Sequence, residues 1–323
     1  MAKRLFLALI AGGMVFFWGA SFPLTKAALQ WLGPTSIAFL RWTISAVILI
    51  GWLAICSMRG VAAAGRRRQT TAVGTAAAPV YPLAGPADKL AELMRLVRRD
   101  GWLLAWVALT GVTLFYFLEN MALRYTTAIN AGVLSNLTCV FIVLVSMVWL
   151  RERLALIEWA AMGIAFLGAT LVSQGAGRFS WSGPGLAGDL MMVLASFFGG
   201  VYSVGGKRLV ADYPADVVTT GVATLGALFL APLALIEGLS LVMPLSAWGA
   251  LLLLGVGAGA LANLWWLLLL SHTSAGRAGA VLFLIPIVAT ALAVVGLGEP
   301  LTPVMALGGL LVLSGVAVMR RGA

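Results

Sequence analysis

Long apolar segments separated by short polar connections make up most of this chain. Runs of about 18 or more apolar residues are typical of helices that span a lipid bilayer, and the sequence contains ten such runs. They cover residues 6–28, 35–57, 102–123, 128–149, 155–173, 188–206, 215–236, 247–270, 275–297 and 301–319. Most connections are only a few residues long, so consecutive helices are expected to run antiparallel. The pattern predicts an all-α integral membrane protein with ten transmembrane helices.

One part of this pattern occurs twice. Residues 124–169 align without a gap with residues 271–316, at a constant shift of 147 positions that places Glu152 on Glu299. Each copy belongs to a group of five predicted spans. Because five is an odd number, the second group must enter the membrane in the opposite orientation to the first. Inverted repeats of this kind are typical of secondary transporters, which bind their substrate near the midplane between the two halves.

The first span aligns with the sixth at a different shift. Lys26 falls on Lys207, a shift of 181 positions. The difference between the two shifts corresponds to an insertion between the first and third spans. The sequence therefore predicts two five-helix repeats, 1–174 and 188–323, joined by a Gly-rich linker at 175–187.

Composition and charge agree with a membrane protein. The chain is 62% hydrophobic and only 10% charged, whereas soluble proteins are about a quarter charged. Its net charge of +10 does not indicate nucleic-acid binding, because the charges follow the predicted spans. With ten spans, Lys and Arg lie on the side of the two termini at all but four of 21 positions, which are Lys26, Arg41, Arg124 and Arg178. The positive-inside rule predicts that both termini lie in the cytoplasm, with the protein in the cytoplasmic (inner) membrane.

The segment 58–101 is the one long connection, and it is predicted to be cytoplasmic. Its first part, to Pro86, contains too few apolar residues to pack and is expected to be disordered. Residues 87–99 have apolar side chains at helical spacing among Lys and Arg. They predict a short amphipathic helix on the membrane surface, attracted to anionic lipid.

Several short motifs resemble the EamA-type family of the drug/metabolite transporter superfamily. They are Trp18-Gly19-Ala20-Ser21-Phe22-Pro23 with Lys26, Leu40-Arg41-Trp42, Arg124-Tyr125-Thr126-Thr127, Glu152-Arg153-Leu154 and Gly298-Glu299-Pro300-Leu301. Two features differ from the family: Arg151 occupies a position where the family has Gly, and the loop 58–101 is atypical. The resemblance implies a secondary transporter of small organic metabolites, often an exporter of amino acids or related metabolites, that works by alternating access. It also implies a central cavity lined by helices 1, 3, 4, 6, 8 and 9.

Two ionisable residues lie well inside the predicted spans, Arg41 in the second and Glu119 in the third. Ionisable side chains are costly inside a bilayer and are expected to face protein or water. Their depths differ by about one helical turn, so they could form a static ion pair that ties the two helices together. Alternatively, one of them faces the cavity and binds a charged group of the substrate or carries a proton for coupling.

Polar and aromatic residues of the predicted cavity helices complete the candidate substrate site. The shift of 147 places Tyr116 opposite Asn263, and Glu119 opposite Trp266. The predicted substrate-binding residues are Trp18, Tyr116, Glu119, Asn136, Tyr202, Asn263 and Trp266. For the two Asn residues, hydrogen bonding between helices is an equal alternative. Pro23 and Pro286 interrupt their helices and are predicted hinges.

The sequence argues against an enzyme. It contains one His and two isolated Cys, and no spacing matches a metal site, a cofactor site or a catalytic pair. The partners expected are therefore a small-molecule substrate and the lipid bilayer, and no pattern bears on the oligomeric state. The alternative function on the same fold is a lipid-translocating or membrane-assembly protein. A closed polar cavity would favour a solute, and a groove open to lipid would favour a lipid.

Overall fold

The computed structural model describes residues 2–70, 88–126, 128–174, 185–297 and 301–321, which form helices and no strand. The α-helices are α1 (Ala2–Ala28), α2 (Pro34–Thr70), α3 (Lys89–Ala108), α4 (Phe115–Tyr125), α5 (Ala128–Ser135), α6 (Leu137–Trp149), α7 (Leu156–Gln174), α8 (Leu186–Asp212), α9 (Ala215–Glu237), α10 (Leu245–Leu253), α11 (Ala262–His272), α12 (Ala275–Leu282), α13 (Ile285–Leu297) and α14 (Pro303–Arg321). Two π-helices continue their neighbours without a break: η1 (Leu109–Leu114) and η3 (Leu254–Leu261).

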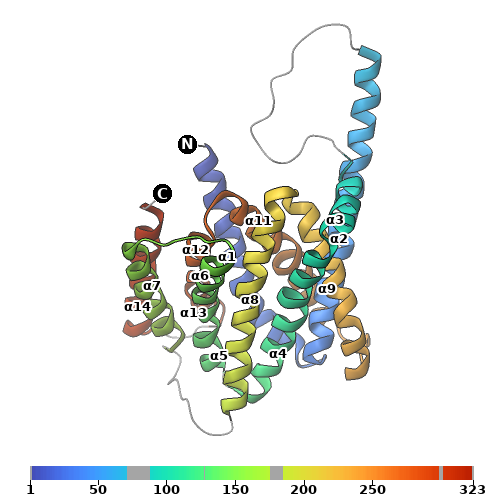
Figure 1. Cartoon of the computed structure of the whole chain (residues 1–323). Helices are drawn as coiled ribbons and strands as arrows, with labels where there is room; N and C mark the ends of the chain where they lie inside the picture. Colours follow the sequence, from blue (N-terminus) through green and yellow to red (C-terminus); the bar gives the residue numbers. More distant parts are fainter. Residues whose placement is uncertain (1, 71–87, 127, 175–184, 298–300, 322–323) are drawn as a thin grey trace.

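The helices stand side by side, and both termini lie at the same end of the bundle (Figure 1). Eight helices of the described residues are long and apolar enough to cross a membrane. The predicted fourth and tenth spans correspond to shorter apolar helices, Val133–Trp149 and Pro303–Met319. The fourth is interrupted near Asn136, because α5 ends at Ser135 and α6 begins at Leu137. The all-helical prediction is thus confirmed, with interruptions that the hydrophobic pattern did not show.

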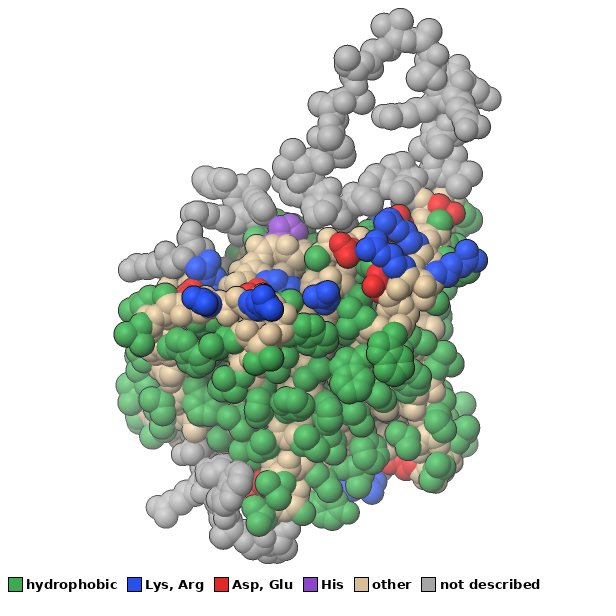
Figure 2. Space-filling model, viewed as in Figure 1, with side chains coloured by type: hydrophobic (Ala, Val, Ile, Leu, Met, Phe, Trp, Pro, Cys, Tyr) green, Lys and Arg blue, Asp and Glu red, His purple; other side chains and the backbone are tan. Residues whose placement is uncertain are grey.

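A belt of hydrophobic side chains surrounds the middle of the visible face, and Lys and Arg gather above it at the end where both termini lie (Figure 2). Many large apolar side chains on the outside are exposed, such as Val148 at 83% and Leu156 at 86%. In water these residues would be costly to expose, whereas lipid tails accommodate them. The belt therefore marks the surface that faces the hydrocarbon core.

Helices α7 and α14 approach each other closely at two glycines, Gly168 on α7 and Gly315 on α14. A Cβ atom added to Gly168 would lie 2.6 Å from the backbone oxygen of Gly308. A Cβ atom added to Gly315 would lie 2.5 Å from the backbone oxygen of Ala161. Both positions therefore require Gly, because the two backbones approach too closely for any side chain. Small residues at such contacts are the usual means of packing helices within a bilayer.

Helix occupies much of the segment 58–101 that was expected to be a loop. Helix α2 continues to Thr70, and residues 71–87 lie outside the described part of the chain. Helix α3 begins at Lys89, where the Asp88 carboxylate accepts hydrogen bonds from the N–H groups of Leu90 and Ala91. The amphipathic helix is therefore present, but it leads directly into the next apolar helix instead of forming a separate element. The backbone departs from helical geometry only at Asp100.

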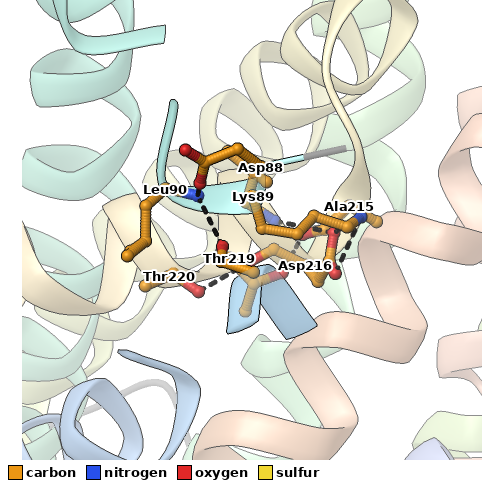
Figure 3. Close-up of polar contacts among 9 residues, drawn as sticks. Asp88, Lys89, Leu90, Ala215, Asp216, Thr219 and Thr220 are labelled. Atoms are coloured by element: carbon orange, nitrogen blue, oxygen red, sulfur yellow. Dashed lines mark hydrogen bonds and ion pairs between the residues drawn. The ribbon is translucent and has the colours of Figure 1, made fainter. Parts of the chain in front are cut away.

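Polar contacts hold the first turns of α3 against the start of α9 (Figure 3). The Lys89 ammonium lies 3.1 Å from both carboxylate oxygens of Asp216, and both side chains are buried. About three turns farther along α3, Asp100 accepts a 2.7 Å hydrogen bond from the Tyr213 hydroxyl. Burial, and then the neighbouring Asp100, raise the pKa of Tyr213, so the hydroxyl keeps the proton that it donates. These contacts require residues from both halves of the sequence.

Candidate functional site

A cavity of about 830 Å³ lies between the helices, and it is lined by every predicted site residue. Its walls include the seven predicted substrate-binding residues, together with Arg41 and the two predicted hinges, Pro23 and Pro286. Other polar residues on its walls, which the sequence analysis did not single out, are Ser21, Thr25, Asn120, Ser135, Thr138, Ser173, Ser203 and Thr290. Short hydroxyl side chains carry a weak signal in a sequence, because they also satisfy their own helix backbone. Whether any of these residues binds a substrate stays a prediction.

The cavity extends toward the end of the bundle that lies away from the termini. Its walls reach Leu29, just beyond the end of α1, and Ser173, near the end of α7. They also reach Met305 in the first turn of α14, whose other end leads to the C-terminus. The cavity therefore extends toward the side that the charge distribution predicts to be outside the cell.

Each half of the sequence contributes a π-helix to the cavity wall at a corresponding position. Shifting η1 (Leu109–Leu114) by 147 positions places it within η3 (Leu254–Leu261). Tyr116 follows η1, and its counterpart Asn263 follows η3. Single π-turns inside α-helices occur frequently at functional sites, because they change the direction in which the following side chains point. The sequence pairing of the two positions thus corresponds to a shared local structure.

Two side-chain hydrogen bonds cross the cavity wall between helices. The Tyr202 hydroxyl donates to Oδ1 of Asn263 at 3.1 Å. Nη2 of Arg41 donates to the Tyr116 hydroxyl at 3.2 Å, and the guanidinium also lies over the Tyr116 ring, 4.6 Å from its centroid. The hydrogen bond from Tyr202 therefore joins α8 to α11 through Asn263, which is the interhelical role given above as the alternative for this residue.

No ion pair joins Arg41 and Glu119 in the part of the chain that the structure describes. Tyr116 and a backbone carbonyl, that of Ala258, bind the Arg41 guanidinium instead. Glu119 lines the cavity half-buried, and no hydrogen bond or ion pair to another described residue satisfies its carboxylate. Arg41 and Glu119 lie at similar depths, which allowed a static ion pair, but these described residues do not form one. Contact depends on the direction of the two side chains as well as on their depth. The cavity thus contains a carboxylate available to a ligand.

Helices are interrupted on the cavity wall at corresponding positions. Asn136 lies between α5 and α6, and Phe283, its counterpart at a shift of 147, lies between α12 and α13. Nδ2 of Asn136 is buried without a hydrogen-bond partner among the described residues. Pro286 is in the first turn of α13, just after the second interruption, whereas Pro23 lies inside the continuous α1. Interrupted helices that line a cavity are typical of transporter binding sites.

At the end nearer the termini, polar contacts around Glu152 connect the α6–α7 loop to α8 and α12. The Glu152 carboxylate binds the Lys207 ammonium of α8 and accepts a 2.8 Å hydrogen bond from the N–H of Ala275, at the start of α12. Lys207 also donates to the carbonyl of Thr273 at 2.7 Å. The preceding residue, Arg151, has a φ of 55°. This left-handed conformation favours Gly, so the departure from the family pattern at Arg151 places a strained residue there.

A second contact of this kind involves Glu158 at the start of α7. Its carboxylate accepts a 2.8 Å hydrogen bond from Nε of Arg277 on α12, and another from the N–H of Ala155. The described residues contain no group of His, Cys, Asp or Glu that could hold a metal ion.

Comparisons with known proteins agree with this architecture. An uncharacterized transporter of Archaeoglobus fulgidus is 28% identical over 306 residues, which cover 94% of this chain and 93% of that protein. A probable terminal-alkyne amino-acid exporter of Streptantibioticus cattleyicolor is 25% identical over 309 residues, with coverage of 95% and 91%. A crystal structure that covers 98% of both chains is similar with a TM-score of 0.74 at 23% identity, which shows the same fold.

A sequence model of the EamA-like transporter family matches residues 5–174 and 186–321, nearly the whole chain. The match confirms the resemblance inferred from the short motifs and agrees with the apolar helices that surround a central cavity. This multi-pass membrane protein therefore belongs to the EamA-like transporter family.

Proposed function

We propose that this protein is a secondary transporter that exports amino acids or related small metabolites across the cytoplasmic membrane. The observation that carries the proposal is the cavity between the helices. On its walls lie the buried Arg41 guanidinium and the Glu119 carboxylate, which has no hydrogen-bond or ion-pair partner among the described residues. A zwitterion is the solute that fits two opposite charges, because its ammonium binds a carboxylate and its carboxylate binds a guanidinium. The exporter from Streptantibioticus cattleyicolor, by its name, moves an amino acid.

We further propose ten transmembrane helices arranged as two inverted five-helix repeats, within 1–174 and 188–323. The packing of α7 against α14 supports this arrangement. Gly168 contacts Gly308, and Gly315 contacts Ala161. A shift of 147 converts the first pair of positions into the second, as expected for two helices related by a two-fold axis. The interrupted fourth helix would span the membrane as the combination of α5 and α6.

Transport would proceed by alternating access. The cavity reaches the helix ends on the side away from the termini, while the Glu152, Lys207 and Ala275 contacts join the helices at the other end. Opening toward the cytoplasm requires these contacts to separate and the halves to rock about the site. The interruptions near Asn136 and Pro286 are where we expect the helices to bend.

The cavity favours a solute over a lipid. Its walls come from both halves of the sequence, and residues of α1, α2, α4, α8 and α11 lie around it. A lipid-translocating protein of the same fold would be expected to open sideways, so that acyl chains remain in the bilayer. The polar residues on these walls support the solute.

Growth and export assays test the function directly. Cells that express the protein should tolerate toxic amino-acid analogues, and should release radiolabelled L-leucine, L-phenylalanine, L-threonine or L-glutamine faster than cells with an empty vector. If expressing cells release none of the four amino acids faster than empty-vector cells, and the protein translocates lipid in reconstituted vesicles, the alternative function is favoured.

The orientation gives a separate prediction. In a variant whose two Cys residues are replaced, Cys introduced at the exposed Ser240 should react with an impermeant maleimide in intact cells. Cys introduced at the exposed Arg153 should react only after the cells are permeabilised. We expect this because the positive-inside rule places Arg153 in the cytoplasm. The reverse labelling pattern would show that the termini lie outside.

Asn136→Ala is the sharpest test of the site among the neutral residues. Because its buried Nδ2 has no partner among the described residues, the change should leave the Tm near that of the parent. The KM for an exported amino acid should rise about tenfold, the usual effect of one lost hydrogen bond to a charged group. Asn263→Ala is the contrasting control: it leaves the Tyr202 hydroxyl without its acceptor and removes one donor from each of two carbonyls, so its Tm should fall. An unchanged KM for Asn136→Ala would remove that residue from the site.

A further inference from the structure

Three side-chain donors on the cavity wall converge on one backbone oxygen. Nε1 of Trp18 donates to the carbonyl of Ala258 at 3.1 Å, Nη2 of Arg41 at 3.2 Å and Nδ2 of Asn263 at 2.9 Å. The donors come from α1, α2 and α11, and all three residues line the cavity. We call these three N–H groups the donor cluster. Ala258 itself is buried within η3.

A single carbonyl oxygen is a poor acceptor for this cluster. It offers two lone pairs, whereas three side-chain donors share it, and one of them is charged. Nε of Arg41 is also buried, with no partner in the described part of the chain. A carboxylate offers about four acceptor positions and a full negative charge, and charge-assisted hydrogen bonds are about twice as strong as neutral ones. The cluster therefore has more donor capacity than its present acceptor can use.

The position of the cluster relative to Glu119 suits a zwitterion. Arg41 contacts the Tyr116 hydroxyl, and Glu119 follows Tyr116 by three residues on α4. Residues three apart on a helix lie on the same face. A ligand at the cluster would therefore have the Glu119 carboxylate within about one helical turn.

We propose that the donor cluster is the subsite for the carboxylate of the substrate. In the present conformation the three donors share the Ala258 carbonyl, and an entering carboxylate replaces it as their acceptor. Glu119 then binds the ammonium group. The proposal rests on the proposed amino-acid transport, and it adds that compounds lacking a carboxylate bind poorly.

Trp18→Phe tests the subsite, because it removes one donor and retains an aromatic ring. The probes are L-leucine, L-phenylalanine, L-threonine and L-glutamine, each compared with its carboxamide, which keeps the ammonium but has no charged carboxylate. Binding to the purified full-length protein is measured from the concentration dependence of the Tm. The matched control is Trp106→Phe, which makes the same change at an exposed position outside the cavity walls.

We expect at least one of the four acids to bind the parent protein about tenfold more tightly than its amide does. Trp18→Phe should weaken the binding of that acid about tenfold and leave the binding of the amide unchanged. The control Trp106→Phe should bind both compounds as the parent does. Arg41→Lys, which keeps the charge but not the planar fork, should weaken the same acid selectively.

Equal binding of acid and amide to the parent would overturn the subsite, and so would equal weakening of both by Trp18→Phe. If none of the four acids stabilises the protein, the subsite is also overturned. Export of amines or amides by cells, with no preference for a carboxylate, would leave the transport function standing and remove the subsite alone.

Discussion

Glu119→Gln should abolish net transport while the amount of folded protein stays near that of the parent. The Glu119 carboxylate has no hydrogen-bond or ion-pair partner among the described residues, so neutralising it breaks no direct contact. Folding should therefore tolerate the change. A substrate ammonium that loses its carboxylate partner typically loses about 2–5 kcal/mol, which corresponds to at least about a thirtyfold weaker interaction.

Two assays separate the roles of Glu119. Exchange of labelled for unlabelled amino acid across a vesicle membrane requires binding but no net proton movement. If Glu119 binds the substrate, Glu119→Gln should stop both exchange and net export. If it is only the coupling acid, exchange should persist and net export should lose its pH dependence. Glu92→Gln, at a surface ion pair on α3, is the control. A fall in folded protein without a change in the activity of the remainder would instead indicate a structural role.

Lys89→Met should be among the most destabilising single changes in the chain. It leaves the Asp216 carboxylate buried, with 4% of its surface exposed, and without its cationic partner. Removing one member of a buried ion pair typically costs about 3–5 kcal/mol. The affected contact joins α3 to α9 (Figure 3), so the loss should extend to the packing between the two halves. The Tm of the purified protein measures the effect.

The double variant Lys89→Met with Asp216→Asn should recover most of that Tm, because it removes both charges together. Arg95→Met is the matched control on the same helix. Its ion pair with Glu92 is exposed at the Arg side chain, and such pairs contribute about 0–1 kcal/mol. A Tm for Lys89→Met equal to that of Arg95→Met would show that the buried pair contributes little.

Several properties of this protein follow from its sequence alone. Hydrophobicity is a local property, so the apolar helices could be placed from runs of side chains without knowing their neighbours. The repeat is likewise visible in the chain, and the two positions that it pairs, Tyr116 and Asn263, each follow a π-helix on the cavity wall. The residues chosen from the sequence line the cavity, because polar and aromatic side chains within apolar helices have few favourable surroundings other than protein or water.

Only the tertiary structure decided which of those side chains meet. The similar depths of Arg41 and Glu119 suggested a pair, but the direction of each side chain depends on helix rotation, which depth does not determine. Arg41 therefore binds Tyr116 and Ala258, and Glu119 remains available. The same reason applies to Lys89 and Asp216, which are 127 positions apart and lie in regions with no sequence signal that links them. Hydrophobic patterning determines where this chain forms helices, whereas side-chain packing between helices determines the contacts, charges and donors that the cavity presents.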